Sequence, residues 1–313
     1  MQRFLVSRIL SMILALWGVS LVAFFLIRVI PVDPVEAYFA INQLPVSEES
    51  MDAIREEQGF NQPLLSQYAN WMWQVFQLDF GKSFVSKQDV ANELISRFWI
   101  TLGIAFTALL FVVFISVPIG VLSAVKQYSL FDRLARTSIF TIASMPNFWL
   151  AFILIYVVAL KWGVLPLMGW GTWQHMILPS LTLALGISPF YIRLIRTSMI
   201  EQMQQPYVLY ARARGLKESV IVLHHLLRGT LPPLLTSLAM TFGGLLGGAV
   251  IIEIVFTIPG IGRYILDSMS ARDYVVLQGF ILLIGVFYIF INFLADIVCA
   301  LIDPRIRLKV EGK

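Results

Sequence analysis

The stretch DFGKSF, from Asp79 to Phe84, contains two tripeptides that carry phosphate chemistry in other proteins. Asp-Phe-Gly binds magnesium in protein kinases, and Gly-Lys-Ser ends the loop that holds nucleotide phosphates in P-loop proteins. A P-loop needs a glycine five residues before Gly81, and Phe76 stands there. No glycine-rich loop or catalytic aspartate motif accompanies either tripeptide. The sequence therefore predicts that the chain has no nucleotide site of its own.

Histidine and cysteine side chains are the next candidates for chemistry, because they bind metals and act as nucleophiles. The chain has three histidines and one cysteine, Cys299, so no disulfide can form within the chain. His224 and His225 are neighbours, whereas His175 lies in another loop, on the opposite side of the membrane in the topology predicted below. The three imidazoles cannot meet in that topology, and no metal site is predicted.

The basic stretch YARARGLKESVIVLHHLLRGTLPP spans Tyr210 to Pro233. Pro206, just before it, suits the first turn of a helix, and Gly215 suits a helix end because glycine adopts positive φ freely. A second helix is predicted over 217–227. Four of its residues share the i, i+3, i+4, i+7 spacing of one helical face. They are Val220, Leu223, His224 and Leu227.

This helix–glycine–helix elbow is too short and too charged to cross a bilayer. Three interpretations fit its residues: a solvated loop, a docking surface for another protein, or a surface that contacts anionic lipid. The residues alone do not choose among them.

The composition of the rest of the chain is typical of an integral membrane protein. Of its 313 residues, 58% are hydrophobic and only 13% are charged, against about one quarter in a soluble domain. Runs without charged residues are close to the roughly 20 residues that a membrane-spanning helix needs. The predicted fold is an all-α integral membrane protein with six transmembrane helices. The spans are about 9–30, 98–125, 137–160, 176–192, 229–252 and 274–295.

The distribution of positive charge predicts the orientation of these spans. Of the 23 Lys and Arg residues, 15 lie in the N-terminus, segments 126–136 and 193–228, and the C-terminus. Cytoplasmic loops carry such an excess, so both termini and the loop 193–228 are predicted to be cytoplasmic. The positive charge is therefore explained by topology, and nucleic acid is not expected as a partner.

The region 31–97 is predicted to be extracytoplasmic, and it contains ten Asp and Glu residues against four Lys and Arg. Two short helices are expected within it, over Ser47–Gly59 with Ser47 as the cap, and over Gln67–Leu78. The first apolar run is longer than a signal-peptide core and lacks a small-residue cleavage site. The first helix is therefore predicted to be retained.

The fifth span contains TFGGLLGGAV, in which two small-residue pairs overlap at four-residue spacing. Such glycines allow close helix packing or leave room for a substrate path. They are Gly243, Gly244, Gly247 and Gly248. Pro232 and Pro233 are expected at the start of this span. Ionisable residues are absent from the middle of all six runs, which favours external energy input over ion-coupled transport.

Several segments, in order and spacing, resemble the integral-membrane permease subunits of ABC-type importers in the dipeptide, oligopeptide and nickel family. The resemblance covers nearly the whole chain. Besides DFGKSF and the basic stretch, it rests on SMPNFWLAF (Ser144–Phe152), WQHMILPS (Trp173–Ser180), FTIPGIGR (Phe256–Arg263), ARDYVVLQG (Ala271–Gly279) and DPRIR (Asp303–Arg307).

The resemblance implies that the loop 193–228 docks a separate ATPase, which binds ATP and magnesium, and that this chain holds no cofactor. The implied coupling residues are Tyr210, Ala211, Arg212, Ala213, Arg214, Gly215, Leu216 and Lys217. The general importer loop begins Glu-Ala-Ala, with glycine four residues after the second alanine. Ala211 and Gly215 keep that spacing, but Leu209 replaces the glutamate, so a contact that depends on the glutamate is in doubt.

The resemblance further implies a bacterial inner-membrane complex of this chain with a second permease subunit, two ATPase subunits and an extracytoplasmic binding protein. SMPNFW and GWGTWQH are closest to the nickel-type branch, so nickel or a metal–chelator complex is the expected substrate, with dipeptides or oligopeptides as the alternative. A stand-alone carrier or channel, and a membrane scaffold that transports nothing, are the rivals from other classes.

Overall fold

The computed structural model describes residues 2–29, 35–36, 39, 47–57 and 61–302. The described chain is helical, with one isolated antiparallel bridge between Lys82 and Asp89. It divides into two compact units. Of the described residues, one unit contains those within 2–101 and 259–293, and the other contains 102–258 with 294–302. The motif Asp303–Arg307 lies outside the described residues.

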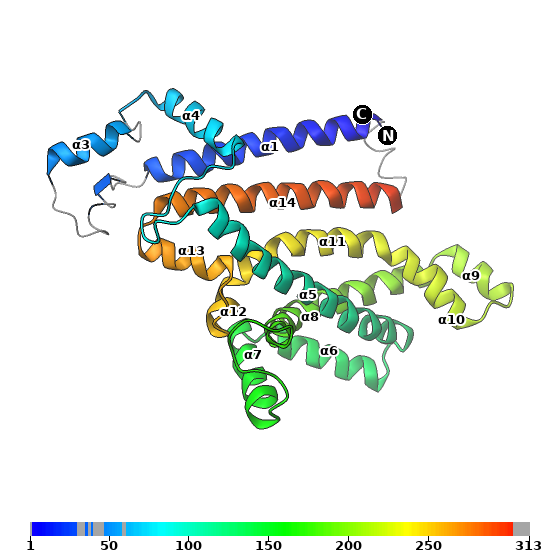
Figure 1. The fold of residues 1–313 in the computed structure, drawn as a ribbon. Coiled ribbons are helices and arrows are strands. Elements are labelled where there is room, and N and C mark those ends of the chain that lie inside the picture. The colour runs from blue at the N-terminus through cyan, green and yellow to red at the C-terminus, as the bar shows by residue number, and fades with distance from the viewer. Residues whose placement is uncertain (1, 30–34, 37–38, 40–46, 58–60, 303–313) are drawn as a thin grey trace. The chain divides into compact units, whose positions relative to one another are not determined.

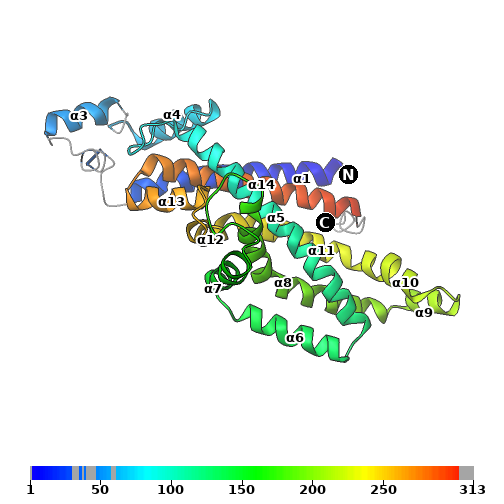
Figure 2. The same ribbon diagram turned by 60° about the horizontal axis from the view of Figure 1, so that its bottom comes forward.

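The first unit is built around two long helices. Helix α1 (Gln2–Val29) and helix α14 (Tyr274–Ile302) run side by side in both ribbon views (Figures 1 and 2). They approach closely at Gly285, where an added Cβ would overlap the side chain of Val19. The shorter helices are α3 (Glu48–Glu57), α4 (Leu64–Phe76) and α13 (Ile261–Ser270). Helix α5 (Val90–Val125) belongs to this unit as far as Thr101.

The second unit is centred on helix α8 (Gln174–Met203). Helices α6 (Leu130–Ala143) and α7 (Asn147–Leu154) pack against it, and α7 continues as the π-helix η1 (Ile155–Lys161) (Figure 2). After α8 come α9 (Pro206–Ala213), α10 (Glu218–Val220), the π-helix η2 (Ile221–Leu226), α11 (Leu227–Gly248) and α12 (Val250–Val255).

Five helical segments are long and apolar enough to cross a membrane. A sixth results if the bent pair α6 and α7–η1 is counted as one span, and only the described residues bear on this number. The predicted fold class, an all-α membrane protein, is confirmed. The spanning segments are Val6–Leu26, Val90–Val125, Gln174–Met203, Glu218–Gly247 and Tyr274–Val298, with Leu130–Lys161 as the bent pair.

Local sequence explains where several helices begin. The prediction of a capped helix after Ser47 is confirmed, because the Ser47 Oγ accepts a hydrogen bond from the Ser50 N–H at 3.1 Å. Its predicted end, Gly59, lies outside the described residues. The second outer helix begins at Leu64, earlier than predicted, because Pro63 supplies the extended residue that precedes it.

Two predictions about prolines and spans need correction. Pro232 and Pro233 lie inside α11 and not at its start, because the helix continues without a break from the π-helix before it. The third predicted span is not straight: its two halves meet at 107° around Ser144–Pro146. Proline disfavours helical conformation in the residue before it, so the chain turns at Met145.

The core of the second unit lies between α8 and its neighbours. Tyr191, Ile195 and Met199 are fully or almost fully buried on α8. Gly120 allows α5 to approach α8 closely, since an added Cβ there would lie 2.9 Å from Ile195 and 3.1 Å from the Ile192 carbonyl oxygen. This packing fixes the long helix α8, which the elbow follows in the chain.

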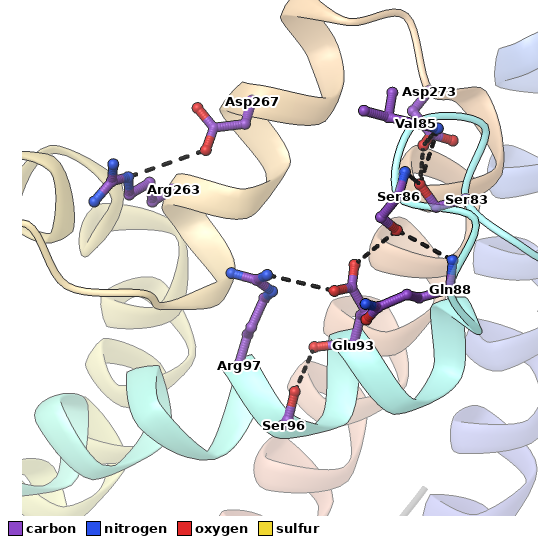
Figure 3. Close-up of polar contacts among 10 residues, drawn as sticks. All are labelled: Ser83, Val85, Ser86, Gln88, Glu93, Ser96, Arg97, Arg263, Asp267 and Asp273. Carbon is purple, nitrogen blue, oxygen red and sulfur yellow. Dashed lines mark hydrogen bonds and ion pairs between the residues drawn. The ribbon is translucent and has the colours of Figure 1, made fainter. Parts of the chain in front are cut away.

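In the first unit, the loop after α4 is tied down by a buried carboxylate (Figure 3). Asp273, immediately before α14, is 1% exposed. Its Oδ2 accepts hydrogen bonds from the Ser83 Oγ at 2.6 Å and the Val85 N–H at 3.3 Å. Nearby on α5, Arg97 pairs with Glu93 at 3.5 Å and lies over the Tyr264 ring at 4.3 Å. Burial, and secondarily Glu93, raises the pKa of Tyr264.

We expect Asp273→Ala to destabilise this unit by about 1.5–3 kcal/mol. Hydrogen bonds to a charged group would be lost, and the buried Ser83 hydroxyl would lose the carboxylate to which it donates. Asp267→Ala is the control: that carboxylate is 73% exposed and 4.0 Å from Arg263, so its removal should cost less than about 0.5 kcal/mol. Thermal unfolding of the detergent-solubilised protein measures both. Equal melting temperatures for the two variants would contradict the role given to Asp273.

Candidate functional site: the helix–glycine–helix elbow

The first helix of the elbow ends in a Schellman motif. Helix α9 begins at Pro206, as predicted. Two hydrogen bonds, one from six residues to one and one nested within it, end the helix. The Leu216 N–H donates to the Ala211 carbonyl at 3.2 Å, and the Gly215 N–H donates to the Arg212 carbonyl at 2.9 Å. The prediction of positive φ at Gly215 is confirmed, with φ at +75°.

The elbow has a buried inner face and an exposed outer face. Val208 and Ala211 are 0% and 7% exposed and belong to the same core cluster as α8. Leu209 and Tyr210, on the other side of α9, are 70% and 69% exposed. Figure 1 shows α9 and α10 at the far end of the α8 and α11 pair. The inner face of the elbow is thus packed into the core around α8, and its outer face exposes the side chains of Leu209 and Tyr210.

An ion pair joins the two arms of the elbow, which are α9 before Gly215 and α10 with η2 after it. The Arg212 Nε donates to the Glu218 Oε1 at 2.7 Å, across Gly215. The Glu218 carboxylate raises the pKa of Arg212, and both groups are about half exposed or more. Exposed pairs contribute at most about 1 kcal/mol, so this bond orients the arms more than it stabilises them.

The predicted apolar face of the second arm is wrong. The buried residues are Ile221 and Leu226, both 0% exposed, whereas Leu223 is 57% exposed. The reason is the π-helix η2, whose hydrogen bonds run from i to i+5 and therefore place residues five apart on one face. His224 and His225 are consequently exposed as well.

The four glycines of α11 do not share one environment. Gly243 is buried, whereas Gly244 and Gly247 are exposed, and a Cβ added to either would meet no atom within 4 Å. Gly248 ends the helix. The three-residue spacing of Gly244 and Gly247 places them on one face, which is open within the described chain.

A buried ion pair joins α6 to α8, before the elbow. The guanidinium of Arg196 contacts both carboxylate oxygens of Asp132, at 2.8 Å and 3.0 Å. Asp132 is fully buried and also accepts the Tyr128 N–H at 3.0 Å. Ser129 caps α6 through the Asp132 N–H at 3.3 Å. This arrangement fixes the start of α6 against α8.

The other candidate residues from the sequence have structural partners. In DFGKSF, the Asp79 carboxylate accepts the Gly81 N–H at 2.9 Å, which shapes a turn, and Ser83 bonds Asp273. His175 lies 2.8 Å from the Thr172 hydroxyl, in the second unit. No group of three metal-binding side chains is found among the described residues.

Sequence reasoning missed the Asp132–Arg196 pair. The only local signal was Ser129 three residues before Asp132, a spacing typical of a helix cap. That signal gives the cap but not the arginine, which is 64 residues away in the chain.

Comparison with known families matches almost the whole chain. Residues 116–308 match the model described as "Binding-protein-dependent transport system inner membrane component". Residues 1–105 match the N-terminal part of such components. The glutathione transport system permease protein GsiC of Escherichia coli K12 is 36% identical over 309 residues, 99% of this chain and 100% of that protein. GsiC of Shigella dysenteriae gives the same values.

Solved structures share the fold at lower identity. An inward-facing structure of the MetNI methionine ABC transporter is 21% identical, with a TM-score of 0.57 over 67% of this chain and 96% of that one. A selenomethionine-soaked form of the same transporter gives a TM-score of 0.58 at equal coverage. These values show a common fold.

The two family matches and the full-length relatives agree with the helical membrane fold. The chain therefore belongs to the family of inner-membrane components of binding-protein-dependent transport systems, as a multi-pass permease subunit of an ABC importer and not itself an enzyme.

Proposed function

We propose that this chain forms half of the path for a glutathione-like or other short peptide in an ATP-driven importer. One observation carries the mechanism: an elbow with an anchored inner face and exposed Leu209 and Tyr210 projects from the end of α8. Exposed apolar side chains on a helix whose opposite face is packed into a core are typical of a docking surface.

The proposed ATPase-coupling surface comprises Tyr210–Lys217. ATP and magnesium bind the separate ATPase pair, whose closure pushes on the elbow. The push passes along α8, because the elbow and α8 share one buried core. A solvated loop would need neither the Schellman end nor the buried Val208.

The open face of α11 is an argument that a second permease subunit is present in the complex. Gly244 and Gly247 leave exposed backbone with no neighbour within the described chain. A glycine face gives lipid little to pack against and allows another helix to approach closely. This face therefore either contacts the other subunit or lines the path between the two.

Peptide cargo is favoured over nickel. Both relatives described above are glutathione permeases, at 36% identity over essentially the full length. Glutathione is a short anionic peptide with a thiol. A path for it must therefore admit the polar backbone and the charges of a peptide, and it does not need to bind a bare metal ion. Nickel and nickel chelates remain the second candidate, on the resemblance of SMPNFW.

The substrate test uses the complex reconstituted in nanodiscs with its binding protein. We expect glutathione or a dipeptide, with the binding protein, to stimulate ATP hydrolysis, and Ni²⁺ or a nickel chelate to leave it at the basal rate. Stimulation by nickel alone would overturn the peptide assignment. ATP-independent flux through the purified chain would overturn the importer mechanism itself.

The region 31–97 is proposed to meet the binding protein, because it is the largest predicted extracytoplasmic segment and is rich in acids and aromatics. Within its described part, Tyr68 and Trp71 of α4 contact Phe24, whereas Trp73 is 67% exposed. Trp73 is therefore available to a partner. Crosslinks from the binding protein that map only to 161–175 and 253–273 would count against this placement.

A further inference from the structure

A cavity of about 560 Å³ lies beside the elbow, and none of the proposed coupling residues, Tyr210–Lys217, lines it. It is formed where the end of α8, the start of α9, η2 and the first turn of α11 come together, all within one unit. The side chains that matter for its chemistry are Gln202, Tyr207, His224, His225 and Arg228. None of the residues that line it is acidic.

The back wall of this cavity is held in place. The Tyr207 hydroxyl donates to the Gln202 Oε1 at 2.7 Å, and the Tyr207 and His225 rings lie 6.4 Å apart. Gln202 packs on Gly229, where an added Cβ would come within 2.7 Å of its oxygen. The Gln202 oxygen accepts the Tyr207 hydroxyl, and the two N–H donors of the Gln202 amide group remain available to a ligand.

The π-helix η2 gives the cavity its histidines. The π register buries Ile221 and Leu226 and thereby leaves His224 and His225 on the cavity side. A π-helical turn inside a helix is rare and is found often at functional sites. It is the second feature, independent of the cavity itself, that marks this place.

The side chains around the cavity are hydrogen-bond donors for an anion. Arg228 has a planar fork of N–H groups, and each imidazole has at least one N–H in either protonation state. No ion pair of Arg228 is found within the described part of the chain, and Glu218 of the elbow is bonded to Arg212. Phosphate oxygens match this set, because guanidinium binds them in a bidentate manner.

The position in the chain indicates the source of the phosphate. The cavity lies between the end of one candidate membrane segment, Gln174–Met203, and the first turns of the next, Glu218–Gly247. It therefore lies at headgroup depth, on the side predicted to be cytoplasmic, where anionic lipids attract basic groups. We propose that this cavity binds the headgroup phosphate of an anionic phospholipid through Arg228, His224 and His225.

The test measures lipid retained by the full-length chain purified with its partner subunits from phosphatidylglycerol-containing membranes. Native mass spectrometry should show bound phosphatidylglycerol in the wild type, and in Arg133→Gln, which removes an exposed arginine of the same predicted side outside the cavity. Arg228→Gln and the double variant His224→Ala/His225→Ala should retain it about tenfold less, the loss expected for one charged hydrogen bond. Arg228→Lys should be intermediate, because it keeps the charge and loses the fork.

The source of the phosphate is tested in nanodiscs. Phosphatidylglycerol should raise the melting temperature of the wild type, and inorganic phosphate at millimolar concentration should not. Protection by inorganic phosphate without protection by the lipid would overturn the lipid assignment. Equal lipid retention in all variants would overturn the site. Normal lipid retention with loss of the ATPase subunits in Arg228→Gln would show that the cavity serves a protein partner instead, which also contradicts the proposal.

Discussion

Gly215→Val is expected to abolish transport while leaving the protein folded in the membrane. Gly215 has φ at +75°, and a Cβ there would meet no atom within 4 Å, so the cost is backbone strain alone. A β-branched residue in this conformation is strained by roughly 1–2 kcal/mol. The strain is relieved by opening the Schellman end, which redirects the second arm and misplaces Tyr210–Lys217. We expect stimulated ATP hydrolysis to fall to the basal rate.

A matched control exists at Gly163. This glycine has φ at +65° and equally open space for a Cβ, but it lies in the loop after η1. Gly163→Val should therefore incur the same strain and keep normal transport. Gly215→Asn should restore activity, since asparagine tolerates positive φ. Wild-type transport and stimulated hydrolysis in Gly215→Val would show that the elbow is only a solvated loop.

Asp132→Ala is expected to give the largest loss of stability among single substitutions considered for this chain. It leaves Arg196, whose side chain is 18% exposed, without its bidentate partner. Removing one member of a buried ion pair costs about 3–5 kcal/mol, because the other charge stays buried and unpaired. The unfolding free energy in detergent, measured by denaturant titration, and the abundance in the membrane should both fall.

Two further variants separate charge pairing from simple loss of contact. Arg136 lies 3.6 Å from the same carboxylate but is 50% exposed, so Arg136→Gln should cost less than about 1 kcal/mol. The double variant Asp132→Leu/Arg196→Met should be more stable than Asp132→Ala, since no buried charge remains. If Asp132→Ala proves as stable as Arg136→Gln, the pair does not hold α6 against α8.

The features predicted correctly from the sequence are those set by a few neighbouring residues. Ser47 caps its helix through a hydrogen bond three residues away, and Gly215 ends α9 because its own backbone allows positive φ. The membrane fold class follows from long apolar runs, which need no knowledge of packing. In each case the physical cause lies in residues that follow one another in the chain.

The features that the sequence did not predict depend on partners far away. The buried pair Ile221 and Leu226 was not predicted, because η2 is a π-helix and the spacing rule assumes an α-helix; both side chains belong to the core cluster that also contains residues of α8. Arg196 could not be assigned to Asp132 because a separation of 64 residues leaves no local pattern. The turn at Pro146 is different: the proline rule would have indicated it, but the run was taken as one straight span on hydropathy alone.

The deep burial of α8 bears on how the protein is inserted during synthesis. In its most apolar window 56% of residues are buried, against 6% for α14, and its buried polar groups include Ser180, whose hydroxyl donates to the Ile104 carbonyl of α5. The translocon releases segments according to their partition into lipid, which favours α14 and disfavours α8. Helix α8 is therefore expected to wait at the translocon beside α5, made earlier, and to leave as a pair with it. Slowed release of α8 would then be a normal step of biogenesis.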